Sequence, residues 1–147
     1  MDDSFDFDYL IPFCQNLWRN KDILANRKYQ CLYKTIVSRI YYSAFHHAKS
    51  WLEINHNFKT REFNYETGKM QNIGGLSEHV QVFRELRKIA KDQKSLKREF
   101  FSASYKLEDL FNNRVEADYD ETSIFKEIEV TDAIENAIFI VNLLKFN

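Results

Sequence analysis

The stretch SRIYYSAFHHAKSWL (38–52) is the best guide to the fold, because it has the features of the middle of a long helix. No Gly or Pro interrupts it, and apolar side chains recur at helical spacing. Arg39 and His46 lie seven residues apart within it, which is about two turns of helix, so their side chains share one face. The stretch therefore predicts a helix that aims a permanent cation and a group titrating near neutral pH the same way.

Length and composition indicate one globular domain. The chain has 147 residues, enough for a core without disulfides, and it is 44% hydrophobic and 29% charged. The formal net charge of −1 argues against nucleic-acid binding by the charge of the whole surface, but it is compatible with a local basic cleft. Cys14 and Cys31 lack metal-ligand spacing, so we expect reduced thiols.

The same composition predicts a cytoplasmic protein with no membrane segment. The N-terminus is acidic and lacks the basic start of a secretory signal. The longest apolar run near the C-terminus, 137–141, is far too short to span a bilayer.

Glycine and proline are scarce, which predicts an all-α protein. Pro12 is the single proline, and Gly68, Gly74 and Gly75 fall in one window. No stretch shows sustained alternation or an Asn-Gly hairpin signal, so we expect no strand, and 56–75 is predicted to be a long mobile loop. The expected architecture is a single up-and-down bundle of four or five helices over 1–147. The helices are expected from about Asp8, over about 26–55, 77–91 and 95–114, and from Val130 or Thr131 onward.

The line formed by Arg39, Ser43 and His46 allows two interpretations. In the first, Arg39 pairs with a carboxylate and His46 is a hydrogen-bonded histidine at the edge of the core. In the second, the pair binds a phosphate and moves a proton. Periodicity alone favours the first interpretation.

Arg114 and Asp118 form a second constellation, one helical turn apart. They form either an ordinary i, i+4 ion pair or a site in which Asp118 orients Arg39 or His46 from a facing helix. The sequence does not separate these two interpretations.

No metal or cofactor site is expected. Glu53 and His56 make one Glu-x-x-His, whereas a di-iron bundle needs two such pairs and two further Glu. No glycine-rich phosphate loop is present. A run of basic residues is best explained as a solvated face, with a phosphate-contacting patch as the alternative; the run comprises Arg84, Arg87, Lys88, Lys91, Lys94, Lys97 and Arg98.

Three segments together resemble the HEPN-domain family, specifically its small stand-alone prokaryotic members. The first is 38–52, where Arg39 and His46 fit an Arg-x(4–6)-His motif at its longest spacing. The second is GLSEHVQVF (75–83), in which His79 and Phe83 fit the start of the family's next helix. The third is NRVEADYD (113–120), and the resemblance extends over about 8–146.

The resemblance implies a helical bundle that forms a two-fold homodimer, with the Arg-x(4–6)-His segments of both subunits meeting in a cleft. It implies a metal-independent endoribonuclease, often a toxin or defence protein with a nucleotidyltransferase-type antitoxin as its partner. Arg39 and His46 would be the catalytic residues. Residues that contact substrate or support that pair would be Tyr42, Ser43, Arg114, Asp118 and Tyr119.

Two other functions remain open at this point. Ile40 follows Arg39 where nuclease-active members usually carry a polar residue. That departure favours a non-catalytic module that binds nucleotides or RNA and works with a nucleotidyltransferase partner. The other function is a purely structural helical interaction protein.

Overall fold

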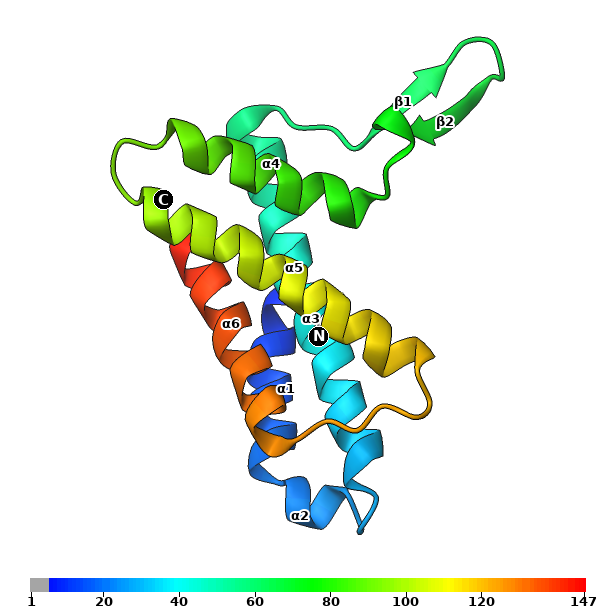
Figure 1. The fold of residues 1–147 in the computed structure, drawn as a ribbon, viewed down its shortest axis with the longest axis vertical. Coiled ribbons are helices and arrows are strands. Elements are labelled where there is room, and N and C mark those ends of the chain that lie inside the picture. The colour runs from blue at the N-terminus through cyan, green and yellow to red at the C-terminus, as the bar shows by residue number, and fades with distance from the viewer. Residues whose placement is uncertain (1–5) are drawn as a thin grey trace, which may run out of the picture.

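The computed structural model describes residues 6–147, which form an all-α bundle with a small hairpin at one end (Figure 1). The predicted fold class is confirmed; the part of the expected domain before residue 6 lies outside the described residues. The elements in chain order are η1 (Phe7–Tyr9), α1 (Leu10–Arg19), α2 (Lys21–Leu24), α3 (Tyr29–His56), β1 (Arg61–Asn64), β2 (Lys69–Asn72), η2 (Ile73–Gly75), α4 (Glu78–Asp92), α5 (Lys97–Tyr119) and α6 (Glu127–Lys145).

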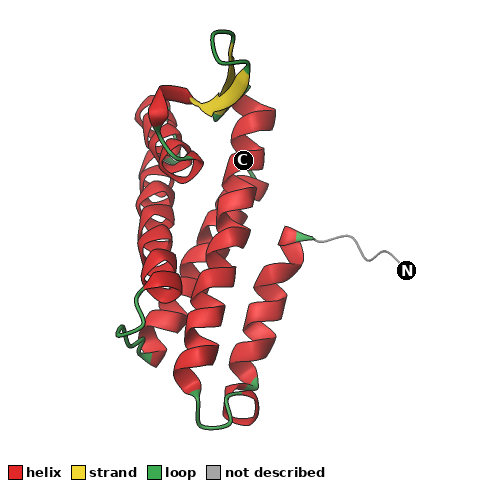
Figure 2. Cartoon of the chain, turned by 90° about the vertical axis from the view of Figure 1, so that its right-hand side faces the viewer, coloured by secondary structure: helices red, strands yellow, loops and turns green. Residues whose placement is uncertain are grey.

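Helix α3 is the axis of the bundle, with α1, α5 and α6 packed along it and α4 near its C-terminal half (Figures 1 and 2). Its inward positions combine small and branched apolar side chains with aromatic ones. Each fully buried Ile or Leu adds roughly 1.5–3 kcal/mol of hydrophobic stabilisation. Buried side chains of α3 include Ile36, Val37, Ile40, Tyr41, Ala44, Phe45, Ala48 and Leu52.

Helix α4 is fixed at its start by a cap and along its length by α5. The Ser77 hydroxyl accepts a hydrogen bond from the Val80 N–H at 3.4 Å, as an N-cap residue does. Further on, Arg87 donates to Glu108 on α5 at 2.5 Å, and its guanidinium lies 4.0 Å from the Tyr105 ring. The cap thus fixes where α4 begins, and the Arg87 contacts hold its later turns against α5.

The segment 56–75 differs from the predicted loop, because it contains the antiparallel pair β1 and β2. The Asn64 side chain accepts from the backbone N–H groups of Glu66 and Thr67 at 2.9 and 3.2 Å. Gly68 follows with φ +67°, which closes a four-residue turn. The turn contains no Asn-Gly pair, which is why the hairpin signal was missed.

The ends of α5 and α6 also differ from the sequence prediction. Helix α5 continues to Tyr119, five residues beyond the expected end at about 114. Helix α6 begins at Glu127, three residues before Val130, because the Glu129 carboxylate accepts the Lys126 N–H at 2.6 Å. Acidic residues in this first turn, Glu127 and Glu129, also suit the positive end of the helix dipole.

The connection between α5 and α6 is tied to the start of α3. The Gln30 side-chain amide donates to the Phe125 carbonyl and accepts from the Phe125 N–H, both at 2.8 Å. Phe125 is itself buried. One side chain thus satisfies the hydrogen bonding of both the N–H and the C=O of a residue far along the chain.

The two thiols lie in contrasting environments. Cys14 on α1 is buried in the core, and burial raises its pKa to about 12. Cys31, in the first turn of α3, is exposed. Among the helices of residues 6–147, none combines the length and the apolar character that a membrane crossing requires.

Candidate functional site

Arg39 and His46 line one pocket of about 280 Å³ on the outer side of α3. Tyr42 lies between them in the sequence and lines the same pocket. Phe7 of η1 and Leu10 of α1 form the opposite wall. The seven-residue spacing therefore does bring both side chains to one cavity.

His46 is packed among aromatic rings. Its imidazole stacks on the Phe7 ring at 3.6 Å between centroids, and the Phe45 ring meets it edge-on at 5.0 Å. Burial lowers the pKa of His46 below its usual value, nearby Lys49 lowers it further, and Glu78 opposes them. The imidazole is therefore neutral at pH 7 and able to accept a proton.

Arg39 lies at the solvent end of the pocket. It is exposed, and its guanidinium lies 5.9 Å from the centre of the Tyr42 ring. No carboxylate within residues 6–147 forms an ion pair with it. Its donors are thus available to a ligand, rather than used in the carboxylate pair that the first interpretation required.

Arg114 is held close to the same tyrosine from α5. Its side chain is only 9% exposed, and its guanidinium lies 5.6 Å from the Tyr42 ring and 5.4 Å from the Phe111 ring. Asp118 accepts from Arg114 Nη1 at 3.4 Å, and this ordinary i, i+4 pair is the ion pair recorded for Asp118. The carboxylate does not pair with Arg39 or His46.

Ser43, Tyr119 and Ile40 occupy different environments. The Ser43 hydroxyl is buried and donates to the Phe7 carbonyl at 3.1 Å, which fixes the turn that carries Phe7 over His46. Tyr119 is 74% exposed, with its ring 6.0 Å from the Arg114 guanidinium. Ile40 is fully buried in the core. Its side chain therefore points away from the pocket, although it follows Arg39 in the sequence.

His79 of α4 also lies near this site, although the sequence offered no reason to place it there. Its Nδ1 lies 2.5 Å from the Tyr41 hydroxyl, and its ring lies 4.6 Å from Phe45 and 5.2 Å from Phe111. Both His46 and His79 therefore contact Phe45. Periodicity within one helix carries no signal for such a partner, because His79 reaches the site from another element.

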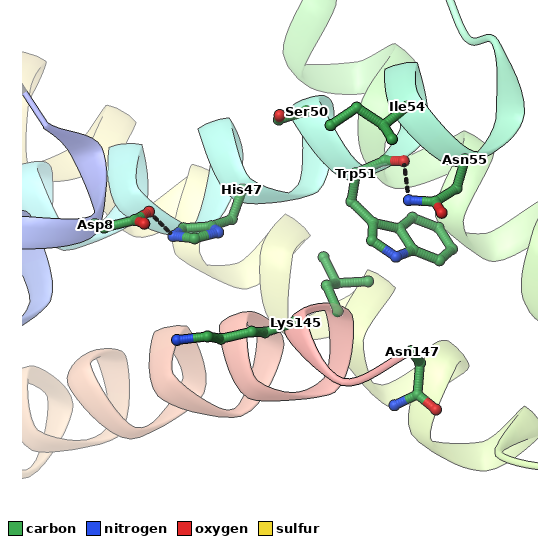
Figure 3. A pocket seen from close by; sticks show the side chains of 9 residues that line it. Asp8, His47, Ser50, Trp51, Ile54, Asn55, Lys145 and Asn147 are labelled. Carbon is green, nitrogen blue, oxygen red and sulfur yellow. Dashed lines mark hydrogen bonds and ion pairs between the residues drawn. The ribbon is translucent and has the colours of Figure 1, made fainter.

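A second pocket, of about 360 Å³, opens on another side of α3 (Figure 3). The close-up shows His47 and Trp51 of α3 facing Lys145 of α6. The His47 Nε2 contacts the Asp8 carboxylate of η1. This contact holds η1 on α3, as the hydrogen bond from Ser43 to Phe7 does.

The other sequence candidates are engaged in ordinary contacts. Glu53 lies 3.9 Å from Lys49, and the His56 ring lies 4.9 Å from Trp51. Among residues 6–147 no three His, Cys, Asp or Glu side chains are grouped in a way that could hold a metal ion. Of the basic run, Arg87 pairs with Glu108 and Lys88 lies 3.8 Å from Glu85, while the others are exposed.

The pocket thus combines a guanidinium that has no ion pair among residues 6–147, a neutral imidazole and aromatic walls. That set can bind a phosphate, accept a proton and stack a planar ring. Searches of protein-family models, curated proteins and solved structures found no match to this chain.

Proposed function

We propose that this chain is an endoribonuclease of the HEPN type, which cleaves RNA without a metal ion. The observation that carries the proposal is that Arg39, without a carboxylate partner among residues 6–147, and His46, held neutral, line the same pocket. The resemblance of 38–52 to the Arg-x(4–6)-His motif supports it.

The pocket residues suit each step of a transesterification. His46 accepts the proton of the ribose 2′-hydroxyl, whose oxygen then attacks the adjacent phosphorus. Arg39 stabilises the charge that gathers on the phosphoryl oxygens. The bond to the 5′-oxygen breaks, and that oxygen takes up a proton, leaving a 2′,3′-cyclic phosphate and a 5′-hydroxyl. Tyr42 offers an aromatic face on which an unpaired base can stack, so single-stranded RNA is the proposed substrate.

A homodimer is part of this proposal. The backbones of Arg39 and His46 are about 10 Å apart along α3, so one chain surrounds a phosphate only partly. A two-fold interface would place a second Arg39 and His46 opposite the first. By the same resemblance, we propose a nucleotidyltransferase-type protein as the partner that restrains the nuclease.

The test is cleavage of a fluorescent single-stranded RNA by purified variants. Arg39→Ala and His46→Ala should each lower the rate by about 10²-fold or more, because each removes a group that acts in the transition state. Arg98→Ala and His56→Ala, which change an exposed arginine and an exposed histidine elsewhere, are the matched controls. Melting temperatures should stay close to that of the wild type. Cleavage unchanged in the double variant Arg39→Ala/His46→Ala would refute the assignment.

Mixing the chains tests the dimer. If both subunits build one cleft, Arg39→Ala mixed with His46→Ala should regain cleavage that neither chain has alone. Sedimentation of the mixture should show a species of twice the chain mass. A monomer that cleaves at full rate would contradict the composite cleft.

A non-catalytic binding module is the second candidate, and one contact favours it. The Phe7 ring covers one face of His46 at 3.6 Å. An imidazole held in this way is better suited to form a rigid wall of a binding pocket than to move as the general base of a reaction. Under this alternative the wild-type protein binds labelled nucleotide and leaves RNA intact at every protein concentration.

A further inference from the structure

Two arginines lie near the ring of Tyr42, and each has a histidine in its neighbourhood. Arg39 lies 5.9 Å from the ring centre, on the helix that carries His46. Arg114 lies 5.6 Å from it, and both Arg114 and His79 contact the Phe111 ring, at 5.4 and 5.2 Å. The half of this arrangement formed by His79 and Arg114 has no role in the cleavage steps above.

Tyr41 sets which nitrogen of His79 carries the hydrogen. The Tyr41 side chain is fully buried, and burial raises the pKa of its phenol well above the usual value, so the hydroxyl keeps its proton. The hydroxyl has no other acceptor among residues 6–147, so it donates to Nδ1 of His79, which lies 2.5 Å away. The neutral ring then carries its hydrogen on Nε2.

That Nε2–H is a donor with no acceptor in the part of the chain that the structure describes. His79 is partly exposed, and no group within residues 6–147 accepts from its Nε2. Burial first, and then Arg114, lower the pKa of His79, while Glu78 raises it and His46 and Lys49 lower it. The ring is therefore neutral at pH 7 and presents one fixed N–H.

Arg114 likewise has a donor without an acceptor among residues 6–147, in a buried environment. Its Nε is buried and has no partner among the described residues, and its single recorded hydrogen bond, to Asp118, is long at 3.4 Å. A buried arginine with so few acceptors is costly unless an anion completes its surroundings. The Nε of Arg114, without a partner among residues 6–147, and the fixed N–H of His79 both point to an anionic ligand.

We propose that His79 and Arg114 form a second phosphate subsite, beside the one at Arg39 and His46. The two subsites hold the phosphates on either side of one nucleoside, whose base stacks on Tyr42. The ligand class is thus an RNA strand spanning two phosphates, and a nucleoside 3′,5′-bisphosphate is its smallest version. This inference rests on the RNA-binding site proposed above, but it does not require that the RNA is cut.

Calorimetric binding to the full chain tests the subsite, with adenosine 3′,5′-bisphosphate compared against the 3′- and 5′-monophosphates. Hydrogen bonds to a charged group predict a gain in affinity of about 10-fold or more from the second phosphate. His79→Ala should abolish this gain. Its affinity for the monophosphate that binds more tightly should stay within about 2-fold of the wild-type value. His79→Gln should keep much of the gain, because its amide also presents an N–H.

Arg114→Lys should reduce the gain as well, since lysine lacks the planar fork. Because Arg114 is buried, its variant is checked by melting, and the partly exposed His79 supplies the decisive comparison. Arg98→Lys and His56→Ala are the matched controls and should keep the full gain.

Equal affinity of the wild type for the bisphosphate and both monophosphates would overturn the subsite. A full gain retained in His79→Ala would overturn it too. If the gain is present and RNA is never cleaved, the nuclease proposal fails and the subsite stands. If the wild type binds none of the three probes, both proposals fail.

Discussion

Phe7 sets how much water reaches His46. Its ring covers the imidazole at 3.6 Å, and the Ser43 hydroxyl fixes its carbonyl from below. Without that cover, the pKa of His46 would lie closer to its ordinary value, because burial is the largest cause of its lowering. One aromatic side chain in the first described turn thus tunes the candidate base.

Lowered pKa values at His46 and His79 make stability depend on pH. Both imidazoles are favoured in their neutral form when folded, so the unfolded chain binds protons more readily below about pH 6.5. The free energy of unfolding should therefore fall as the pH drops from about 6.5 through the folded pKa values. Urea unfolding at pH 7.5 and 5.5 measures the difference.

The variant His46→Gln should show a smaller loss than the wild type over that range, whereas His56→Gln should match the wild type. The groups near the two imidazoles are Lys49, Glu78 and Arg114. Glu78, whose pKa is lowered chiefly by its hydrogen bond from Thr60, loses its stabilising contribution only below its ordinary value of 4.5. An equal loss in His46→Gln and wild type would show that His46 does not contribute.

At the scale of elements, the sequence predicts helices well where the apolar period is long. The helical spacing of apolar residues in α3 is enough to predict that Arg39 and His46 share one face, since helix geometry fixes the direction of each side chain. Helix ends were predicted less well, because local hydrogen bonds decide them. Glu129 starts α6 before its first buried residue, and Asp118 continues α5 by pairing with Arg114.

The site was only half predictable for the same reason. Arg39, Tyr42 and His46 share one helix, so their relation follows from spacing alone. Arg114 and His79 come from α5 and α4, and their distance from Tyr42 and Phe45 depends on how those helices pack. Likewise, only packing shows that Ile40 belongs to the core.

The hairpin is expected to be dispensable for folding. It extends beyond the helical body in Figure 2, and its base is closed by the Ile73 N–H, which donates to the Thr60 carbonyl at 3.0 Å. Replacing 62–71 by a short Gly-Ser turn should leave the melting temperature within a few degrees of wild type, since none of its strand residues is buried. A large drop in thermal melts would show that the hairpin stabilises the bundle.

At the scale of the whole molecule, contacts between distant parts of the chain hold α3 at the centre. Gln30 bonds both backbone groups of Phe125, and Lys34 Nζ donates to the Asp120 carbonyl at 2.8 Å. These bonds join the start of α3 to the segment that links α5 and α6. The same segment follows α5, the helix that bears Arg114 and packs against α3.

Gln30→Ala should therefore lower the free energy of unfolding by about 1–3 kcal/mol, because it leaves the Phe125 backbone groups without partners. The pocket at Arg39 lies further along α3, so nucleotide affinity should hardly change. Gln71→Ala, which alters an exposed glutamine of the hairpin, is the control and should be nearly neutral in the same urea titration. A neutral Gln30→Ala would show that water replaces the lost bonds.

The contrast between the two thiols gives this protein a built-in labelling position. Cys14 is shielded from reagents by the core and by a pKa of about 12, whereas Cys31 faces solvent. Cys31 lies roughly 12 Å from Arg39 along the axis of α3. A maleimide dye thus attaches at one place in the unmodified chain, within range to report by fluorescence when RNA or a second subunit arrives at the pocket.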